Sequence, residues 1–442
     1  MTLDVRDAAR DAADRDALVV AGEAWSWARL AKSVAPVMRS LAGEGFPEGS
    51  SPPCTVVARL DVPTLLRQYA LVSARVPMHL LHPAHTETER TRLADALRRA
   101  SLPAAGDDER ALAIVYTSGT SGNAKGVVLS RRAFAESARA HAANLGWQDD
   151  DRWLLRIPTA HIGGLSTITR CLLARRCVVL GDDAVPLRVQ IERDRVTIAS
   201  LVPTQLRRLI DDAPDWRPPR HLRAVLLGGG PAPAELLRDA ADRGWPVLTT
   251  YGLTETCSQV VTQPYGTVNR GELGSGRPLA GVELRVVDDV IQVRGAMLCS
   301  GYVEGAPPLT GDGWLVTGDR GRLDEHGYLH VLGRGSDLII SGGENVDPLE
   351  VEAALRDLPG VRDTCVFGVP DREWGERVAA VVVGDADFTA LDDALRDRVS
   401  RFKLPRLYAR ADALPLTHAG KVDRRAAAQR FSDRLSPPSP RE

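Results

Sequence analysis

Short apolar runs recur between residues 54 and 252, separated by longer segments in which apolar residues recur every three or four positions. The short runs are typical of buried strands, and the longer segments are typical of amphipathic helices. The strand-like runs lie at residues 54–60, 112–117, 153–158, 177–181, 197–203, 224–230 and 246–252. This alternation predicts layers of parallel α/β sheet, in which ligands bind at the carboxyl ends of the strands.

Three other regions have patterns of their own. Residues 10–45 are expected to be helical, because apolar residues recur at helical spacing at Leu30, Val34, Met38 and Leu41. Residues 270–332 combine glycine-rich turns with short strands and predict a small β-region. After Gly333 a new strand–helix pattern starts, which is long enough for a separate domain of about 100 residues.

The predicted fold class is therefore α/β, with a large N-terminal domain of several subdomains and a small α+β C-terminal domain. We place the N-terminal domain at residues 1–333 and the C-terminal domain at residues 337–432. Residues 433–442 are rich in proline and serine, so a disordered tail is expected there.

Composition narrows the class of protein. The 442 residues carry a formal net charge of −2, which gives no electrostatic reason to expect nucleic acid or an anionic membrane as a partner. No apolar run approaches the ~18 residues of a membrane span, and residues 1–16 lack the apolar stretch of a signal peptide. The six cysteines form no CxxC pair and fit a reducing compartment, so a cytoplasmic location is expected.

Lysine is rare in this chain. Of 56 basic residues only four are lysines, at positions 32, 125, 403 and 421. A lysine that remains where arginine is the rule can be needed for its compact, mobile ammonium group. Lys32 lies in an ordinary helical pattern, whereas Lys125 and Lys421 lie inside motifs and are candidate functional residues.

The strongest local motif connects the strand-like run before residue 117 to a helical segment after residue 128. Its serine and threonine hydroxyls and glycine backbone N–H groups can bind phosphate oxygens, and Lys125 adds a positive charge. It is not a Walker A loop, because the glycine before the lysine and the hydroxyl residue after it are missing. The alternative is a surface turn. The candidate phosphate ligands are Thr117, Ser118, Gly119, Thr120, Ser121, Gly122 and Lys125.

A second motif, Tyr251-Gly-Leu-Thr-Glu-Thr256, follows the strand-like run at 246–252. The face of Tyr251 can stack on a purine, the Thr254 hydroxyl can bind a phosphate, and Glu255 can hold Mg²⁺ against that phosphate. The turn at Gly228, Gly229 and Gly230 would let a flat ligand approach the backbone, although an ordinary turn is the alternative.

Two further motifs lie nearer the C-terminus. Asp319 follows a glycine and can accept hydrogen bonds from two ribose hydroxyls, with Arg334 behind it. Lys421 lies in a turn-like segment, Pro415-Leu-Thr-His-Ala-Gly-Lys-Val-Asp-Arg-Arg425.

In this order, across residues 110–425, the motifs resemble the adenylate-forming superfamily of acyl-CoA synthetases, luciferases and peptide-synthetase adenylation domains. The resemblance implies ATP, Mg²⁺ and coenzyme A as cofactors and a mobile C-terminal domain that rotates about a hinge at Ser336. It implies that loop 117–125 clamps the β- and γ-phosphates and that Tyr251 and Gly228–Gly230 flank adenine. Thr254, Glu255, Asp319 and Lys421 would serve the α-phosphate, the magnesium, the ribose and the charge developing during adenylation. A CoA-side loop would contain Ser341, Gly342, Gly343 and Glu344.

Several segments also resemble o-succinylbenzoate–CoA ligases of menaquinone biosynthesis, among them residues 155–170, 200–207, 226–233, 254–259 and 339–345. The resemblance places His161 beside the acyl pocket and makes Arg170 the candidate ligand for a second substrate carboxylate, with Thr204 or Gln259. The alternatives are a core histidine at His161 and a surface salt bridge at Arg170.

The sequence therefore predicts a two-step, AMP-forming acid–thiol ligase, with o-succinylbenzoate as the favoured acid. Another aryl- or acyl-CoA ligase, or a stand-alone adenylation enzyme that loads a carrier protein, remains the alternative. A non-catalytic nucleotide-binding protein is the least favoured reading, because the loop, Glu255 and Lys421 are all present. The oligomeric state is not readable from the sequence.

Overall fold

The computed structural model describes residues 2–99, 106–117, 125–230, 232–334, 338–415 and 422–438. The chain divides into two compact units, and the main boundary lies between Gly333 and Arg334. The first unit comprises residues 1–83, 100–116 and 126–333, and the second comprises residues 84–99, 117–125 and 334–442.

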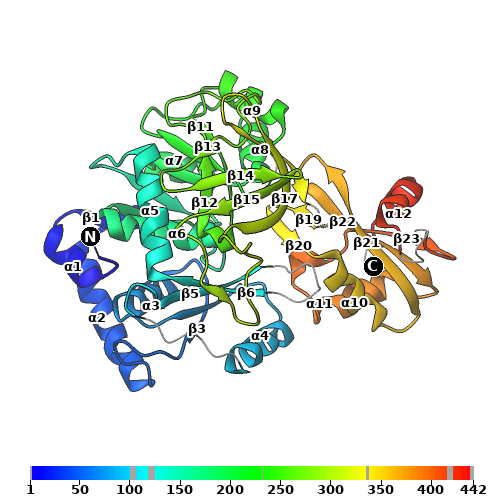
Figure 1. Cartoon of the computed structure of the whole chain (residues 1–442), viewed down its shortest axis with the longest axis horizontal. Coiled ribbons are helices and arrows are strands. Elements are labelled where there is room, and N and C mark those ends of the chain that lie inside the picture. The colour runs from blue at the N-terminus through cyan, green and yellow to red at the C-terminus, as the bar shows by residue number, and fades with distance from the viewer. Residues whose placement is uncertain are drawn as a thin grey trace. The chain divides into compact units, whose positions relative to one another are not determined.

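A nine-stranded sheet is the largest layer of the first unit (Figure 1). Its order is β13-β12-β11-β10-β9-β7-β8-β1-β2, and the strands from β11 to β1 are parallel to their neighbours. Strands β7 to β11 correspond to predicted apolar runs, which are buried because helices cover such sheets, whereas β1 was not predicted. The bounds are β1 Asp16–Val20, β2 Glu23–Ser26, β7 Arg152–Leu155, β8 Cys177–Leu180, β9 Ile198–Leu201, β10 Ala224–Leu227, β11 Val247–Leu253, β12 Ser258–Thr262 and β13 Arg277–Pro278.

Two smaller sheets complete the strands of this unit. A five-stranded sheet has the order β16-β6-β5-β4-β3, and a four-stranded sheet in the predicted β-region has the order β14-β15-β17-β18. Their bounds are β3 Cys54–Val57, β4 Met78–Leu81, β5 Ala111–Thr117, β6 Lys125–Ser130, β14 Glu283–Val287, β15 Val290–Arg294, β16 Gly301–Tyr302, β17 Leu315–Leu323 and β18 Leu329–Arg334.

Helices α5 (Arg131–Leu145) and α6 (Ile162–Ala174) pack side by side and both contact β12 of the nine-stranded sheet. The Ser130 hydroxyl caps α5 by accepting a hydrogen bond from the Ala133 N–H at 3.1 Å. Residues 164–172 of α6 are all buried, so this helix runs through the protein interior. Helices α7 (Leu187–Arg193), α8 (Pro203–Asp212) and α9 (Ala234–Asp242) connect the strands that follow.

The expectation of an all-helical segment at 10–45 is wrong for residues 16–26, which form the hairpin of β1 and β2. Leu18 and Val19 are β-prone and buried, and Ala21 and Gly22 have φ of 48° and 89°, as a tight hairpin turn requires. The helical spacing belongs only to α2 (Trp27–Gly43). Helix α1 is Val5–Asp11, and α3 is Val62–Ser73.

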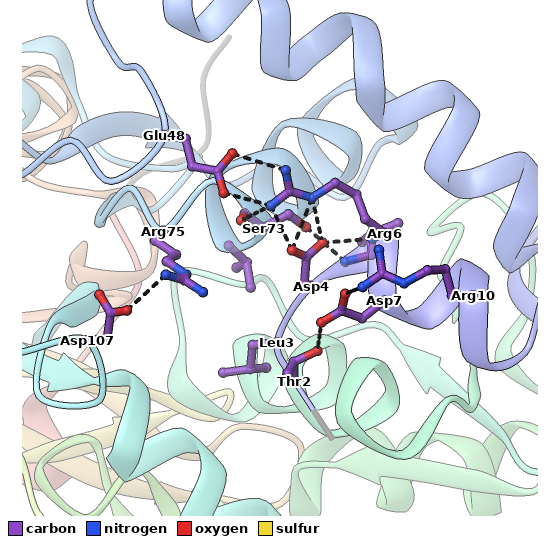
Figure 2. A network of polar contacts seen from close by, with 12 residues as sticks. Thr2, Leu3, Asp4, Arg6, Asp7, Arg10, Glu48, Ser73, Arg75 and Asp107 are labelled. Carbon is purple, nitrogen blue, oxygen red and sulfur yellow. Dashed lines mark hydrogen bonds and ion pairs between the residues drawn. The ribbon is translucent and has the colours of Figure 1, made fainter.

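Polar contacts and a small apolar patch attach the N-terminal segment to the first unit. Figure 2 shows the Arg6 guanidinium between the carboxylates of Asp4 and Glu48, each at 2.8 Å. The Arg6 and Glu48 side chains are 44% and 50% exposed, so this ion pair contributes little to stability. Burial of Leu3, Val5 and Ala8 is the main contribution.

The second unit is built on the sheet β20-β19-β22-β21, with β23 parallel to β22. Its elements are α4 Glu87–Arg99, β19 Ile339–Ser341, β20 Glu344–Val346, α10 Pro348–Arg356, β21 Val361–Asp371, β22 Gly375–Gly384, α11 Phe388–Arg396, β23 Leu407–Ala411 and α12 Arg424–Phe431. The expected disorder at 433–442 is wrong for residues 433–438. Ser436 exchanges two backbone hydrogen bonds with Tyr408, at 2.8 and 3.0 Å, so this part of the tail extends the sheet.

Candidate active site

Four predicted site residues follow neighbouring parallel strands of the nine-stranded sheet. His161 comes after β7, Thr204 after β9, Gly228 after β10 and Thr254 after β11. The sheet order β11-β10-β9-β7 is parallel throughout, so the carboxyl ends of these strands meet at one edge. Residues far apart in sequence are therefore gathered where open α/β sheets bind their ligands.

The turn after β10 is built for close backbone packing. A Cβ atom on Gly228 would lie 2.3 Å from the Thr250 Oγ1, and Gly229 has a φ of +75°. Side chains rarely fit either condition, so the glycines are required by the local geometry. The turn presents backbone atoms at the sheet edge, as is required if Gly228–Gly230 flank adenine.

Tyr251 on β11 and Asp319 on β17 meet across two sheets. The Tyr251 hydroxyl donates a hydrogen bond of 2.8 Å to the Asp319 Oδ2. Asp319 is 5% exposed, and its backbone N–H donates to the Thr317 Oγ1 at 3.1 Å. The candidate adenine-stacking residue and the candidate ribose ligand are thus in direct contact within the first unit.

Glu255 lies in a 3₁₀ turn, Thr254–Thr256, directly after β11. The Tyr302 hydroxyl donates to the Glu255 Oε1 at 3.0 Å, and the Glu255 carbonyl accepts from the Cys299 N–H at 2.8 Å. The next residues, Cys257 and Ser258, have φ of 52° and 87°, which is unusual for residues with side chains. Sequence reasoning missed Tyr302, since nothing in its local pattern marks it.

Arg170 is buried, with 2% of its surface exposed, so the alternative of a surface salt bridge is wrong. Its guanidinium donates 2.9 Å hydrogen bonds to the Gln259 Oε1 and to the Ser137 Oγ. Among the described residues no carboxylate neutralises it, and its Nε has no hydrogen-bond partner there. Burial lowers the pKa of Arg170 to about 10, which leaves the group cationic at neutral pH. The structure thus joins the predicted pair Arg170 and Gln259, while Thr204 is the second residue of α8, after β9.

His141 and Trp153 complete this buried polar cluster. The Gln259 side-chain amide nitrogen lies 3.1 Å from the His141 Nδ1. The His141 ring stacks on Trp153 at a centroid distance of 4.9 Å, and the Arg170 guanidinium lies 5.9 Å from the same Trp153 ring. Burial, and then the charges of Arg170 and Arg223, hold the pKa of His141 well below its usual value. The sequence signal that could have found His141 is its spacing of four from Ser137 on one helical face.

His161 is the N-cap residue of α6, and its ring lies 5.0 Å from that of His82, which follows β4. A Cβ atom on Gly164 would lie 2.3 Å from the Ile157 carbonyl oxygen, so glycine lets the first turn of α6 pack on the preceding backbone. His79, in the same sequence region as His82, is instead hydrogen-bonded to Thr55 and Tyr116, and burial lowers its pKa to about 4.

Some predicted residues fall outside the described part of the chain. They are Ser118, Gly119, Thr120, Ser121, Gly122, Ser336 and Lys421, and for Arg334 the backbone alone is described. Thr117 ends β5 and Lys125 begins β6. The Asp423 N–H donates to the Pro415 carbonyl at 2.9 Å, so the residues that flank the Lys421 segment are joined.

The predicted CoA-side loop is the turn of a β-hairpin in the second unit. Ser341 of β19 pairs with Glu344 of β20, and Gly342 and Gly343 have φ of 63° and 86°. Two positive φ values are typical of a type I′ turn, which asparagine and glycine favour. The Gly342 N–H also donates to the Trp374 carbonyl at 2.8 Å, so the turn is held against its neighbour.

Comparison with known proteins gives matches over most of the chain. The sequence model of the AMP-binding enzyme family matches residues 53–303, and that of the AMP-binding enzyme C-terminal domain matches residues 350–421. The 2-succinylbenzoate–CoA ligase of Bacillus pumilus is 40% identical over 330 residues, which cover 70% of this chain and 67% of the relative.

Two solved structures of one Bacillus subtilis protein are also similar. A double mutant of o-succinylbenzoate CoA synthetase, bound with its product analogue OSB-NCoA, has a TM-score of 0.87 at 29% identity, covering 96% of this chain and 97% of that chain. The same synthetase in complex with its acyl-adenylate intermediate OSB-AMP has a TM-score of 0.70 at 29% identity, with coverages of 95% and 96%.

Proposed function

The chain belongs to the AMP-binding enzyme family, and on that premise we propose that it is an ATP-dependent ligase that joins 2-succinylbenzoate to coenzyme A. In the first step a carboxylate oxygen of the acid attacks the α-phosphorus of ATP, giving acyl-adenylate and pyrophosphate. In the second step the CoA thiol attacks the acyl carbon, the thiol proton is lost, and AMP leaves. The partners are thus small molecules.

The observation that carries the choice of acid is the buried guanidinium of Arg170. A buried cation without an anion is destabilising, and a site that keeps one is arranged for an anionic ligand. Gln259, which accepts a hydrogen bond from Arg170, lies on β12, the strand that directly follows the Thr254–Glu255 turn. An acid with two carboxylates can place one at the adenylation site and the other at this cation. The relative and the two solved structures, whose names carry this acid, support the same choice.

For the nucleotide, we assign Tyr251 and the Gly228–Gly230 turn to adenine, Asp319 to the ribose and Thr254 to the α-phosphate. The hydrogen bond between Tyr251 and Asp319 supports this assignment, because it brings the base ligand and the sugar ligand together. The loop 117–125 and Lys421 are assigned to phosphate oxygens through the family resemblance. Cations and backbone N–H groups lower the barrier by stabilising the negative charge that develops there.

The Glu255 carboxylate fits a magnesium ion. Mg²⁺ prefers carboxylate oxygens, and the contact of Glu255 with the neutral Tyr302 hydroxyl leaves the negative charge available. Once bound, the ion would neutralise charge on the phosphates. Tyr302 orients the carboxylate toward one position, as groups behind a metal ligand commonly do.

A cytoplasmic location belongs to the same proposal. ATP and coenzyme A are cytoplasmic substrates, and all six cysteines are buried, which fits a protein of a reducing compartment. Among the described residues, no helix combines the length and hydropathy that a bilayer span needs.

The test is thioester formation from ATP, Mg²⁺ and CoA with 2-succinylbenzoate, benzoate, 4-coumarate, acetate and a medium-chain fatty acid. With 2-succinylbenzoate we expect the CoA thioester to form, together with an equal amount of AMP. Product from another acid alone would keep the ligase chemistry and refute the acid. Pyrophosphate exchange that requires an added carboxylic acid, without any CoA thioester, would point to another acceptor, such as a carrier protein. Absence of exchange with every acid would refute the proposed ligase activity.

A further inference from the structure

The hydrogen bonds around Arg170 have only one consistent polarity. A guanidinium can only donate hydrogen bonds, so the Gln259 atom at 2.9 Å from it must be the carbonyl oxygen. The amide nitrogen of Gln259 then faces the His141 Nδ1 at 3.1 Å and must donate to it. His141 is therefore neutral, with its single proton on Nε2, which has no hydrogen-bond partner among the described residues.

The second acceptor of Arg170 is fixed in the same way. The Ser137 hydroxyl donates to the Cys257 carbonyl at 2.8 Å, which leaves an oxygen lone pair for the Arg170 guanidinium. Both acceptors are neutral groups, and each is oriented by a third group behind it. Ser137 and His141 lie one turn apart on α5, so this one helix determines how both acceptors are presented.

Two acceptors use two of the five N–H hydrogens of a guanidinium. Its planar shape suits a carboxylate, which can accept two parallel hydrogen bonds from it. Neutral acceptors hold the group in place without neutralising it. A glutamate in place of Gln259 would cancel the charge internally.

We propose that His141 and Gln259 determine specificity for acids with two carboxylates: His141 is a positioning residue that orients the Gln259 amide, and Gln259 holds Arg170 without neutralising its charge. This inference rests on the proposed ligase activity and on the assignment of Arg170 to the second carboxylate. It adds that selectivity depends on the Nδ1 acceptor of His141, which bonds Gln259 and, among the described residues, has no hydrogen bond to Arg170.

The readout is a ratio of two values of kcat/KM, one for 2-succinylbenzoate and one for an acid that lacks a carboxylate. Two such acids are 4-oxo-4-phenylbutanoate, which keeps the side-chain carboxylate, and 2-butanoylbenzoate, which keeps the ring carboxylate. The one that forms a thioester identifies the carboxylate that is adenylated and serves as the reference acid. A structural defect lowers both values of kcat/KM together and leaves their ratio unchanged.

We expect His141→Phe to lower this ratio about tenfold, because the Gln259 amide loses its acceptor and its orientation. The His141→Asn variant can present a side-chain oxygen near the position of Nδ1 and is expected to keep the ratio within about threefold of the unaltered protein. Gln259→Glu is expected to lower the ratio about a hundredfold, because its carboxylate pairs with Arg170. The matched control is His221→Phe, which removes a part-buried histidine bound to the Ile191 carbonyl outside this cluster.

An unchanged ratio in His141→Phe, or an equal fall in His141→Asn and His141→Phe, would overturn the role of His141. If His141→Phe does not fold, Gln259→Glu decides, and an unchanged ratio there overturns the proposal. Thioester formation from 2-succinylbenzoate by the unaltered protein tests the proposed function separately. No thioester would refute that function, whereas thioester formation with unchanged ratios in the variants would refute only the roles of His141 and Gln259.

Discussion

Each unit of the molecule contains a buried cation. One of them, Lys403, is neutralised by carboxylates, whereas the other, Arg170, is held by neutral groups. In the second unit the Lys403 ammonium lies 2.8 Å from the Glu89 carboxylate and 3.0 Å from the Glu350 carboxylate, and all three side chains are at most 7% exposed. In the first unit Arg170 is equally buried, and its hydrogen-bond acceptors among the described residues are the neutral groups of Gln259 and Ser137.

The difference separates a structural cation, Lys403, from Arg170, which the proposed function assigns to a ligand. Lys403 joins α4, α10 and the turn before β23, and removing it would leave two carboxylates buried without a partner. Arg170 costs stability in the free protein, because no carboxylate among the described residues neutralises it, and under the proposed function the second carboxylate of the acid would offset that cost. The rare lysine at 403 therefore serves the fold, and the comparison predicts which substitutions change stability and which change activity.

The largest effect is expected at Lys403, the buried cation that carboxylates neutralise. Lys403→Met should lower the free energy of unfolding by about 3–5 kcal/mol, because Glu89 and Glu350 stay buried without their cation. Urea-induced unfolding measures this. As a control, adding Glu89→Gln and Glu350→Gln to the same variant should restore much of the loss. A decrease below about 1 kcal/mol in Lys403→Met would contradict the structural role.

Lys421 is a third cation, assigned to the reaction by family resemblance. Lys421→Ala should slow adenylation about 100- to 1000-fold and leave thioester formation from supplied acyl-adenylate nearly unchanged, because the charge it stabilises develops in the first step. Pyrophosphate exchange and single-turnover thioester formation measure the two steps. The free energy of unfolding should not change. Equal losses in both half-reactions would refute this assignment.

At the uncompensated cation, Arg170→Met should lower kcat/KM for 2-succinylbenzoate about a hundredfold and leave the reference monocarboxylate within about threefold. Its free energy of unfolding should stay the same or rise, since a buried unpaired charge is removed. Steady-state kinetics and urea unfolding on the same preparation check both. Destabilisation comparable to that of Lys403→Met would erase the contrast between the two cations.

Low pH should weaken the ion pairs of Lys403 and so lower the free energy of unfolding. Burial alone would raise the pKa of Glu89, but the Lys403 charge and hydrogen bonds from Lys403, Thr86 and Ser400 lower it to about 2. A folded-state pKa below the unfolded value means that the stabilisation is present above about pH 4.5 and is lost as pH falls toward 2. We expect Glu89 to account for a loss of about 2 kcal/mol between pH 5 and pH 3. The measurement is urea unfolding across this range, with Glu89→Gln, which should lose less, as the control.

The smallest effect is expected at Glu255, the carboxylate that the proposed function assigns to Mg²⁺. Tyr302→Phe should raise the Mg²⁺ concentration needed for half-maximal activity about tenfold, because the carboxylate loses the group that orients it. A magnesium titration at saturating ATP checks this, with Tyr328→Phe as a matched control in β18's flanking turn. An unchanged magnesium requirement would remove Tyr302 from the site.

Much of the fold could be predicted because its signals are local. The apolar runs that became β7 to β11 are consecutive in sequence, and each encodes a strand buried on both faces. The hairpin at 16–26 was missed because the helical spacing of the next segment, Trp27–Gly43, was extended back across the Ala21-Gly22 turn. The pairing of Ser436 with Tyr408 was missed because composition says nothing about a partner strand elsewhere in the chain.

The sequence by itself determined the α/β class, the strand-end motifs and their order, because these depend on periodicity and on residue chemistry within a few positions. Only the tertiary structure decided that Arg170 is buried, that Gln259 is its acceptor and that His141 stands behind Gln259, at sequence separations of 89 and 118 residues. It also decided that Lys403 is neutralised by Glu89, which lies 314 residues away. The physical reason is that burial and electrostatic compensation are properties of neighbours in space, and no pattern within one segment records them.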